Sequence, residues 1–178
     1  MGQGKVAVAM GSYSDLNRLD PLFAVFQEFG VEFEARVLSA HRTPEETAAW
    51  ASSLEARGFG AVVAAAGGSA ALAGAAASHT ILPVIGLPIP TDCMGGLDSL
   101  LSTVQMPAGI PVATVAVGGG GAENAGLLAV QILARSDASL AEMLRARRRR
   151  QAAKVLERDA ALQLRLGGEL PGIPPEGR

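Results

Sequence analysis

The residues best suited to chemistry stand together in one six-residue stretch, Ser39 to Pro44, of this 178-residue chain. The stretch holds His41, one of only two histidines, with Arg42 directly after it. Imidazole titrates near neutral pH, so a histidine can both give and take a proton. A guanidinium binds phosphate or carboxylate through paired N–H donors. We therefore predict that His41 is a general acid and base and that Arg42 forms part of an anion site. The alternative interpretation is that His41 is a purely structural histidine.

A second polar turn, Gly11 to Asp15, follows an apolar run and precedes a helical pattern. Free backbone amides at such a junction bind anions, and Gly11 allows a ligand to approach the backbone closely. Ser12 and Ser14 add hydroxyl groups, and the carboxylate of Asp15 can accept hydrogen bonds from ribose. The competing interpretation is that Ser14 or Asp15 only caps the helix.

A third candidate loop runs from Gly67 through Gly68 and Ser69 to Leu72 and carries no bulky polar group. It can wrap closely around a small ligand, although close packing of a helix on a sheet would select the same residues. The glycine-rich segment 118–126 is not a dinucleotide-binding fingerprint, because no register gives G-x-G-x-x-G. We interpret His79 as structural and Cys93 as inert.

Short apolar runs alternate with helical patterns along the first 134 residues, which predicts an α/β protein with a parallel sheet covered by helices on both faces. In such sheets, ligands bind at the carboxyl ends of the strands, where the polar loops lie. The predicted strands are 6–10, 31–38, 61–65, 82–87 and 111–117. The predicted helices are 16–29, 44–57, 70–78, 97–104 and 122–134. Thr43 is expected to cap the second helix, and Pro44 suits its first position.

The last forty residues follow a complete five-strand unit, so they have little core left to join. We predict a single domain over residues 1–137, one long helix over 138–166 that packs on a neighbouring subunit, and a flexible tail over 167–178. We interpret Arg147 to Arg150 as a solvated helix face or a subunit contact rather than a nucleic-acid site.

Composition excludes several classes of protein. The net charge of −2 gives no field that favours nucleic acid or an anionic membrane. One cysteine allows neither an internal disulfide nor a cysteine zinc cluster. No apolar run reaches the roughly 18 residues that span a bilayer, and no signal pattern is evident, so a cytoplasmic location is expected.

The motifs, taken in order, resemble the N5-carboxyaminoimidazole ribonucleotide mutase family of purine biosynthesis. The resemblance covers about residues 5 to 160. It implies a flavodoxin-like three-layer αβα fold, a homo-octamer with C-terminal helices reaching between subunits, and neither a metal nor an organic cofactor. The motifs that carry it are MGSYSD (10–15), SAHRTPE (39–45), GGSAALAG (67–74), LDSLLSTVQMPAGIPVAT (97–114) and ENAGLLAVQIL (123–133).

The resemblance also implies roles for single residues. Ser12, Asp15 and Arg42 bind the ribonucleotide, and His41 is the general acid and base that shuttles a proton while trapped carbon dioxide moves from the exocyclic nitrogen to the ring carbon. Other residues are expected around the substrate, from the resemblance and from the composition of the three loops. They are Gly11, Ser14, Ser39, Ala40, Gly67, Gly68, Ser69 and Leu72.

Two positions in the third loop depart from the mutase pattern. Where mutases usually carry histidine and proline, this chain has Ala71 and Ala73. Related carboxylases that use free carbon dioxide have small residues there. A carboxylase acting on aminoimidazole ribonucleotide, a paralogue acting on another nucleotide and a non-catalytic nucleotide-binding module therefore stand as alternatives. A flavin-binding module is less consistent with one Trp and one Tyr.

Overall fold

One parallel sheet of five strands forms the centre of the computed structural model, which describes residues 4–167. The strand order is β2-β1-β3-β4-β5, and every neighbouring pair is parallel. The predicted α/β class with a parallel sheet is confirmed. The strands are β1 (Lys5–Met10), β2 (Phe33–Val37), β3 (Phe59–Gly67), β4 (Val84–Ile89) and β5 (Ala113–Thr114).

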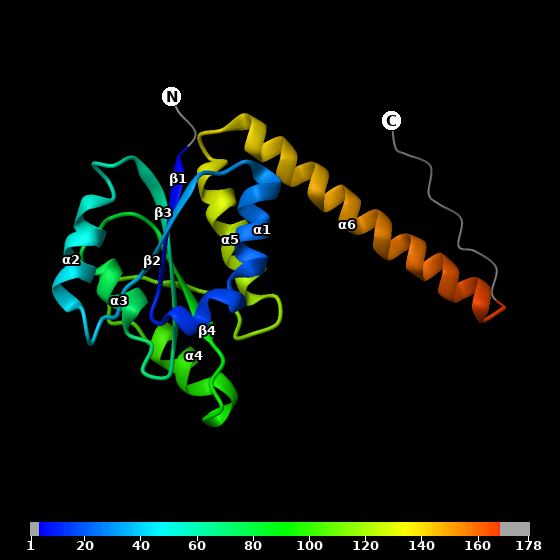
Figure 1. The fold of residues 1–178 in the computed structure, drawn as a ribbon. Helices are drawn as coiled ribbons and strands as arrows, with labels where there is room; N and C mark the ends of the chain where they lie inside the picture. Colours follow the sequence, from blue (N-terminus) through cyan, green and yellow to red (C-terminus); the bar gives the residue numbers. More distant parts are fainter. Residues whose placement is uncertain (1–3, 168–178) are drawn as a thin grey trace. The chain divides into compact units, whose positions relative to one another are not determined.

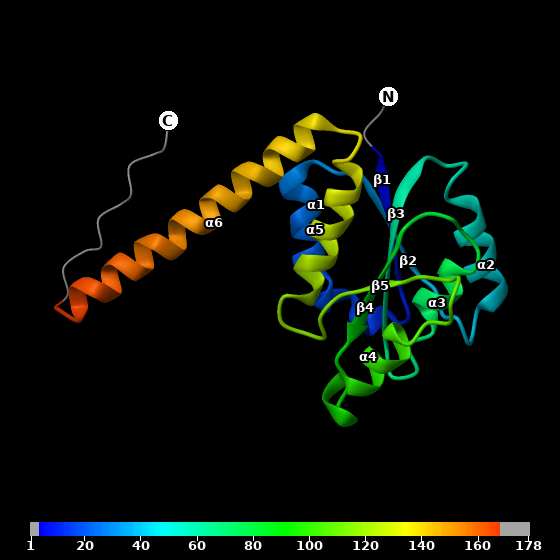
Figure 2. The ribbon, with the colours of Figure 1, turned by 180° about the vertical axis from the view of Figure 1, so that it is seen from behind.

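Helices cover both faces of the sheet, which gives three layers (Figures 1 and 2). α1 and α5 pack against each other on one face, and α2, α3 and α4 lie on the other. The helices are η1 (Tyr13–Arg18), α1 (Asp20–Phe29), α2 (Pro44–Ser53), α3 (Leu72–Ala77), η2 (Met94–Gly96), α4 (Leu97–Val104), α5 (Gly121–Leu133) and α6 (Ala138–Arg165).

The core follows from the apolar strands. β1 is buried from Val6 onward, and β3 and β4 are buried along most of their length, because helices cover both of their faces. On the α1 side, Gly126 lets α5 approach closely, since a Cβ there would lie 3.0 Å from Cβ of Val25. The edge strand β2 is largely exposed. The central strands that lead to the polar loops are therefore packed on both faces.

The first predicted helix, 16–29, is wrong in its boundaries. The chain forms the 3-10 turn η1 first and then starts α1 at Asp20. Pro21 lies in the first turn of α1, where its missing N–H would have had no helical partner. Pro21 therefore marks the beginning of a separate helix.

The last strand is much shorter than predicted. The apolar run 111–117 predicted seven residues, but only Ala113 and Thr114 pair, with Ile85 and Gly86 of β4. β5 is at the edge and has a single neighbour, so an extended apolar segment does not by itself make a strand. β3 deviates the other way and extends beyond both ends of the predicted run.

The chain divides into two units, Met1–Leu140 and Ala141–Arg178. Within the second, α6 carries an ion pair from Glu142 to Arg149 at 2.7 Å and exposed apolar side chains such as Val155 and Leu156. Packing of this helix on a neighbouring subunit stays a prediction. The predicted tail falls, from residue 168 onward, outside the described residues. No helix within 4–167 is both long enough and apolar enough to cross a bilayer.

Candidate active site

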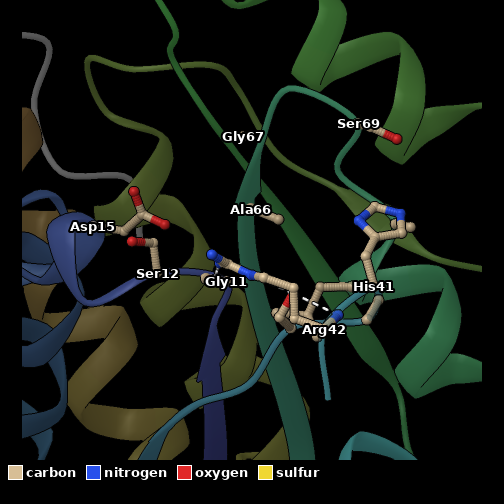
Figure 3. Close-up of a pocket in the computed structure, with 12 residues that line it drawn as sticks. Gly11, Ser12, Asp15, His41, Arg42, Ala66, Gly67 and Ser69 are labelled. Carbon is tan, nitrogen blue, oxygen red and sulfur yellow. Dashed lines mark hydrogen bonds between the residues drawn. The ribbon is translucent and has the colours of Figure 1, made fainter. Parts of the chain in front are cut away.

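The strand order brings three polar loops together. β1 lies between β2 and β3, so the loops that follow these strands are neighbours at the carboxyl edge of the sheet. They enclose a cavity of about 360 Å³ (Figure 3). The stretch around His41 and the turn from Gly11 to Asp15, which the sequence singled out separately, meet in this one cavity.

Most of the predicted site residues line the cavity. Ser14 and Gly68 are not among the lining residues, whereas Ala66 and Ala71 line it although they were not predicted as binding residues. For Ala66 the only signal is its position beside Gly67, whereas Ala71 is a departure from the family pattern in the third loop. The predicted residues that line the cavity are Gly11, Ser12, Asp15, Ser39, Ala40, His41, Arg42, Gly67, Ser69 and Leu72.

The loop that presents His41 is closed by the side chain of Thr43. The Thr43 hydroxyl accepts a hydrogen bond from Ser39 N–H at 2.9 Å and donates to Ser39 O at 3.1 Å. The prediction that this side chain caps α2 is therefore wrong in its role, since Thr43 stands at the N-cap but makes no side-chain capping bond. The hydroxyl satisfies both backbone groups of Ser39 and fixes the shape of the loop.

Arg42 links the first two loops. Its backbone N–H and its Nε both donate to Ser39 Oγ, at 3.2 and 3.3 Å, and its Nη2 donates to Gly11 O at 3.2 Å. Figure 3 shows the guanidinium extended toward Gly11, on the side where Ser12 and Asp15 lie. The positive charge is thus held in place at one end of the cavity before any ligand arrives.

The turn after β1 supplies a hydroxyl and a carboxylate at the same end. Ser12 Oγ accepts from Ser14 N–H at 3.3 Å and lies 2.8 Å from Ser14 Oγ. Ser14 therefore serves the turn itself. Burial raises the pKa of the Asp15 carboxyl above its ordinary value, while a hydrogen bond from the Ser12 backbone and the charge of Arg18 oppose that rise. Asp15 is thus a partly desolvated acceptor at the wall of an open cavity.

The imidazole of His41 faces the other way. In Figure 3 it turns from the Arg42 side toward the loop that carries Ser69. That loop also contributes Ala71 and Leu72, which add small apolar walls to the cavity. The cavity therefore has one side with a positive charge held in place and a separate side with an imidazole.

This division limits the chemistry that the site can perform. A ligand with a phosphate or carboxylate at one end and a group that exchanges a proton at the other fits it. Within the described residues, no three or more His, Cys, Asp and Glu side chains come together as a possible metal site.

A family model, named relatives and a solved structure all match most of this chain. Residues 5–154 match the family model described as AIR carboxylase. A protein of Mycobacterium leprae named N5-carboxyaminoimidazole ribonucleotide mutase is 50% identical over 170 residues, which are 96% of this chain and 98% of that one. A protein of Saccharolobus solfataricus with the same name is 52% identical over 141 residues, 79% of this chain and 88% of its own. The crystal structure of Treponema denticola PurE superposes with a TM-score of 0.82 at 30% identity, covering 90% of this chain and 99% of that chain.

Proposed function

The chain belongs to the AIR carboxylase family, and from that premise we propose that it is an N5-carboxyaminoimidazole ribonucleotide mutase. Relatives that are 50% and 52% identical over most of this chain carry that name. The reaction is an isomerisation in purine biosynthesis, in which a carboxyl group moves from the exocyclic nitrogen of the imidazole to a ring carbon.

One observation carries the assignment to this cavity: His41 and the group formed by Ser12, Asp15 and Arg42 line the same space. Arg42 and Ser12 bind the ribonucleotide phosphate, because the fixed guanidinium and the hydroxyl supply N–H and O–H donors. Asp15 accepts hydrogen bonds from the ribose. The imidazole base then extends toward His41.

The proton balance of the reaction explains why one histidine is enough. Release of carbon dioxide from the carbamate leaves the electron pair of the broken N–C bond on the exocyclic nitrogen, which takes up one proton to become an amine. Attack of the ring carbon on carbon dioxide then releases one proton from that carbon. His41 donates the first proton and accepts the second, so it ends in its starting state. Ala66, Ala71 and Leu72 form apolar walls of the cavity. Such walls help to confine the uncharged carbon dioxide because they exclude water.

The direct test supplies the purified protein with the carbamate substrate and follows the carbon-linked product. His41→Asn is expected to lower kcat by roughly 10²- to 10⁴-fold, in the range for loss of a general acid–base group, with the affinity for the product nucleotide unchanged. His79→Asn is the matched control, because His79 lines a different cavity, formed partly by Glu55 and Pro83. Equal activity of His41→Asn and the unmodified protein contradicts the mechanism.

A carboxylase that uses free carbon dioxide is the second candidate, and the position of Ala71 favours it. This residue, which stands where mutases usually carry histidine, lines the cavity. Turnover of aminoimidazole ribonucleotide with bicarbonate, without turnover of the carbamate, would select the carboxylase. Nucleotide binding without either activity would select a non-catalytic module.

We further propose that the protein is a cytoplasmic homo-oligomer, an octamer, that binds neither nucleic acid nor membrane. The support is an exposed apolar stripe along α4, where Leu97, Leu101 and Val104 are 45–47% exposed at helical spacing. The exposed apolar side chains of α6 are a second surface of this kind. Light scattering coupled to gel filtration should give eight times the chain mass of 18.1 kDa, and Leu101→Glu should reduce it.

A further inference from the structure

A buried serine outside the cavity connects the ends of two strands beside the site. Ser99, in the first turn of α4, has no exposed surface. Its Oγ accepts a hydrogen bond from Gly68 N–H at 2.9 Å and donates one to Ile89 O at 2.7 Å. One hydroxyl thus joins the residue after β3 to the last residue of β4, with its donor and an acceptor position both used.

The bond to Gly68 determines where the Gly67 carbonyl points. The peptide between these residues is trans, so the Gly67 carbonyl is directed opposite to the Gly68 N–H and away from α4. The ladder gives the same direction. Ala65 O accepts from Gly11 N–H, on the β1 side, and backbone groups two residues apart in a parallel strand face the same neighbour. At Gly67, β1 has already ended at Met10, so this side of Gly67 opens into the cavity.

Gly68 itself explains why an external anchor is needed. Its φ of +68° lies in the left-handed region, and a Cβ built there has no neighbour within 4 Å. Glycine has access to many other backbone conformations, so the local chain does not hold this peptide in one orientation. A second hydroxyl, that of Ser102, lies 3.2 Å from Gly68 O, on the other peptide of the same residue.

We propose that Ser99 is a positioning residue that holds the Gly67 carbonyl as a hydrogen-bond acceptor for the amino group on the substrate base. This rests on the proposed mutase function. Gly67 and His41 line the same cavity. Ser99 acts on the base and its proton transfer, while the phosphate site at Arg42 is left as it is.

The test compares Ser99→Ala with Thr103→Val. Thr103 is a matched control because it is on the same helix, is 2% exposed, and donates only to the helical carbonyl of Ser99, at 2.7 Å. We expect Ser99→Ala to lower kcat about ten- to a hundred-fold, the effect of a small misplacement of reacting groups. The dissociation constant of the product nucleotide should change less than about threefold, because the phosphate contacts remain. A larger share of the carbamate should end as free amine and carbon dioxide. Thr103→Val should leave all three quantities unchanged.

A double-mutant cycle with Gly68→Ala tests whether Ser99 acts through this peptide. If it does, the combined variant is only slightly slower than the slower single variant. Multiplied effects, an unchanged kcat in Ser99→Ala, or an equal loss in Thr103→Val each overturn the role of Ser99. If Ser99→Ala does not unfold cooperatively, Ser99→Cys replaces it. The thiol is too weak a donor and acceptor to hold the Gly68 N–H as the hydroxyl does, so kcat should still fall, and wild-type kcat and partitioning in Ser99→Cys overturn the role.

The proposed function is tested separately in the same experiment. Absence of carbamate turnover in the unmodified protein overturns the mutase assignment and this inference with it. Turnover in the unmodified protein that Ser99→Ala does not change overturns the inference alone.

Discussion

Replacement of Arg42 by lysine separates the charge of this residue from its geometry. In the structure, the guanidinium is held by Nε bonded to Ser39 Oγ at 3.3 Å and Nη2 bonded to Gly11 O at 3.2 Å. Lysine keeps the positive charge but has no planar fork, so it cannot bond both anchors and offer a further N–H to a phosphate.

The magnitude follows from the hydrogen bonds that are lost. Hydrogen bonds that involve a charged group contribute about 1.5–3 kcal/mol each. If the variant loses the equivalent of one such bond to the substrate phosphate, KM for the carbamate rises about ten- to a hundred-fold, since about 1.4 kcal/mol is a factor of ten. The guanidinium does not reach the side of the cavity where His41 lies, so kcat should stay within about threefold.

Steady-state kinetics and calorimetric titration with the product nucleotide measure the two effects. Arg36→Lys is the matched control, because Arg36 is an exposed arginine of β2 that does not line the cavity. An unchanged KM in Arg42→Lys would refute the assignment of this side chain to the anion site. A loss of kcat at constant KM would also refute it, because that result places Arg42 at the reacting atoms.

Three further predictions concern stability. Burial raises the pKa of Asp15, so this carboxyl stabilises the fold most when it is protonated and loses that contribution as pH rises through its folded-state pKa. Asp15→Asn should therefore raise Tm at pH 7 while weakening nucleotide binding, and a lower Tm would contradict this. Thr43→Val leaves the backbone N–H of Ser39 without its partner and should lower the free energy of unfolding by about 1–3 kcal/mol, measured by urea denaturation. An unchanged urea midpoint would contradict the role of Thr43 in closing the His41 loop. Burial acts to raise the pKa of Glu34, but hydrogen bonds from Trp50 Nε1, at 3.0 Å, and from Arg57 hold that pKa below its ordinary value. The carboxylate therefore stabilises the fold at neutral pH and loses this contribution as pH falls through its folded-state pKa. Glu34→Gln should lower Tm at pH 7 and match the unmodified protein in acid, and a difference that persists in acid would exclude the ionised carboxylate as the cause.

The regular elements were predictable wherever local pattern decides them. The buried runs of β1 and β4 and the helix 97–104 are found with boundaries close to those expected, because continuous apolar residues and helical spacing are local properties. β5 was not predictable in length, because a strand at the edge exists only where its neighbour offers hydrogen bonds. The role of Thr43 was also out of reach, since the choice between capping α2 and closing on Ser39 depends on the backbone path of the loop.

By itself, the sequence determined the chemical inventory of the site and its location at the carboxyl ends of parallel strands. An imidazole, a guanidinium, serine hydroxyls and a carboxylate stand after apolar runs, and this is visible without coordinates. The tertiary structure decided which of these loops meet. Because β1 is inserted between β2 and β3, the turn at Ser12 and the loop at His41 share a cavity although about thirty residues separate them. Strand order depends on how helices of both layers pack across the sheet, and no local segment of the chain encodes it.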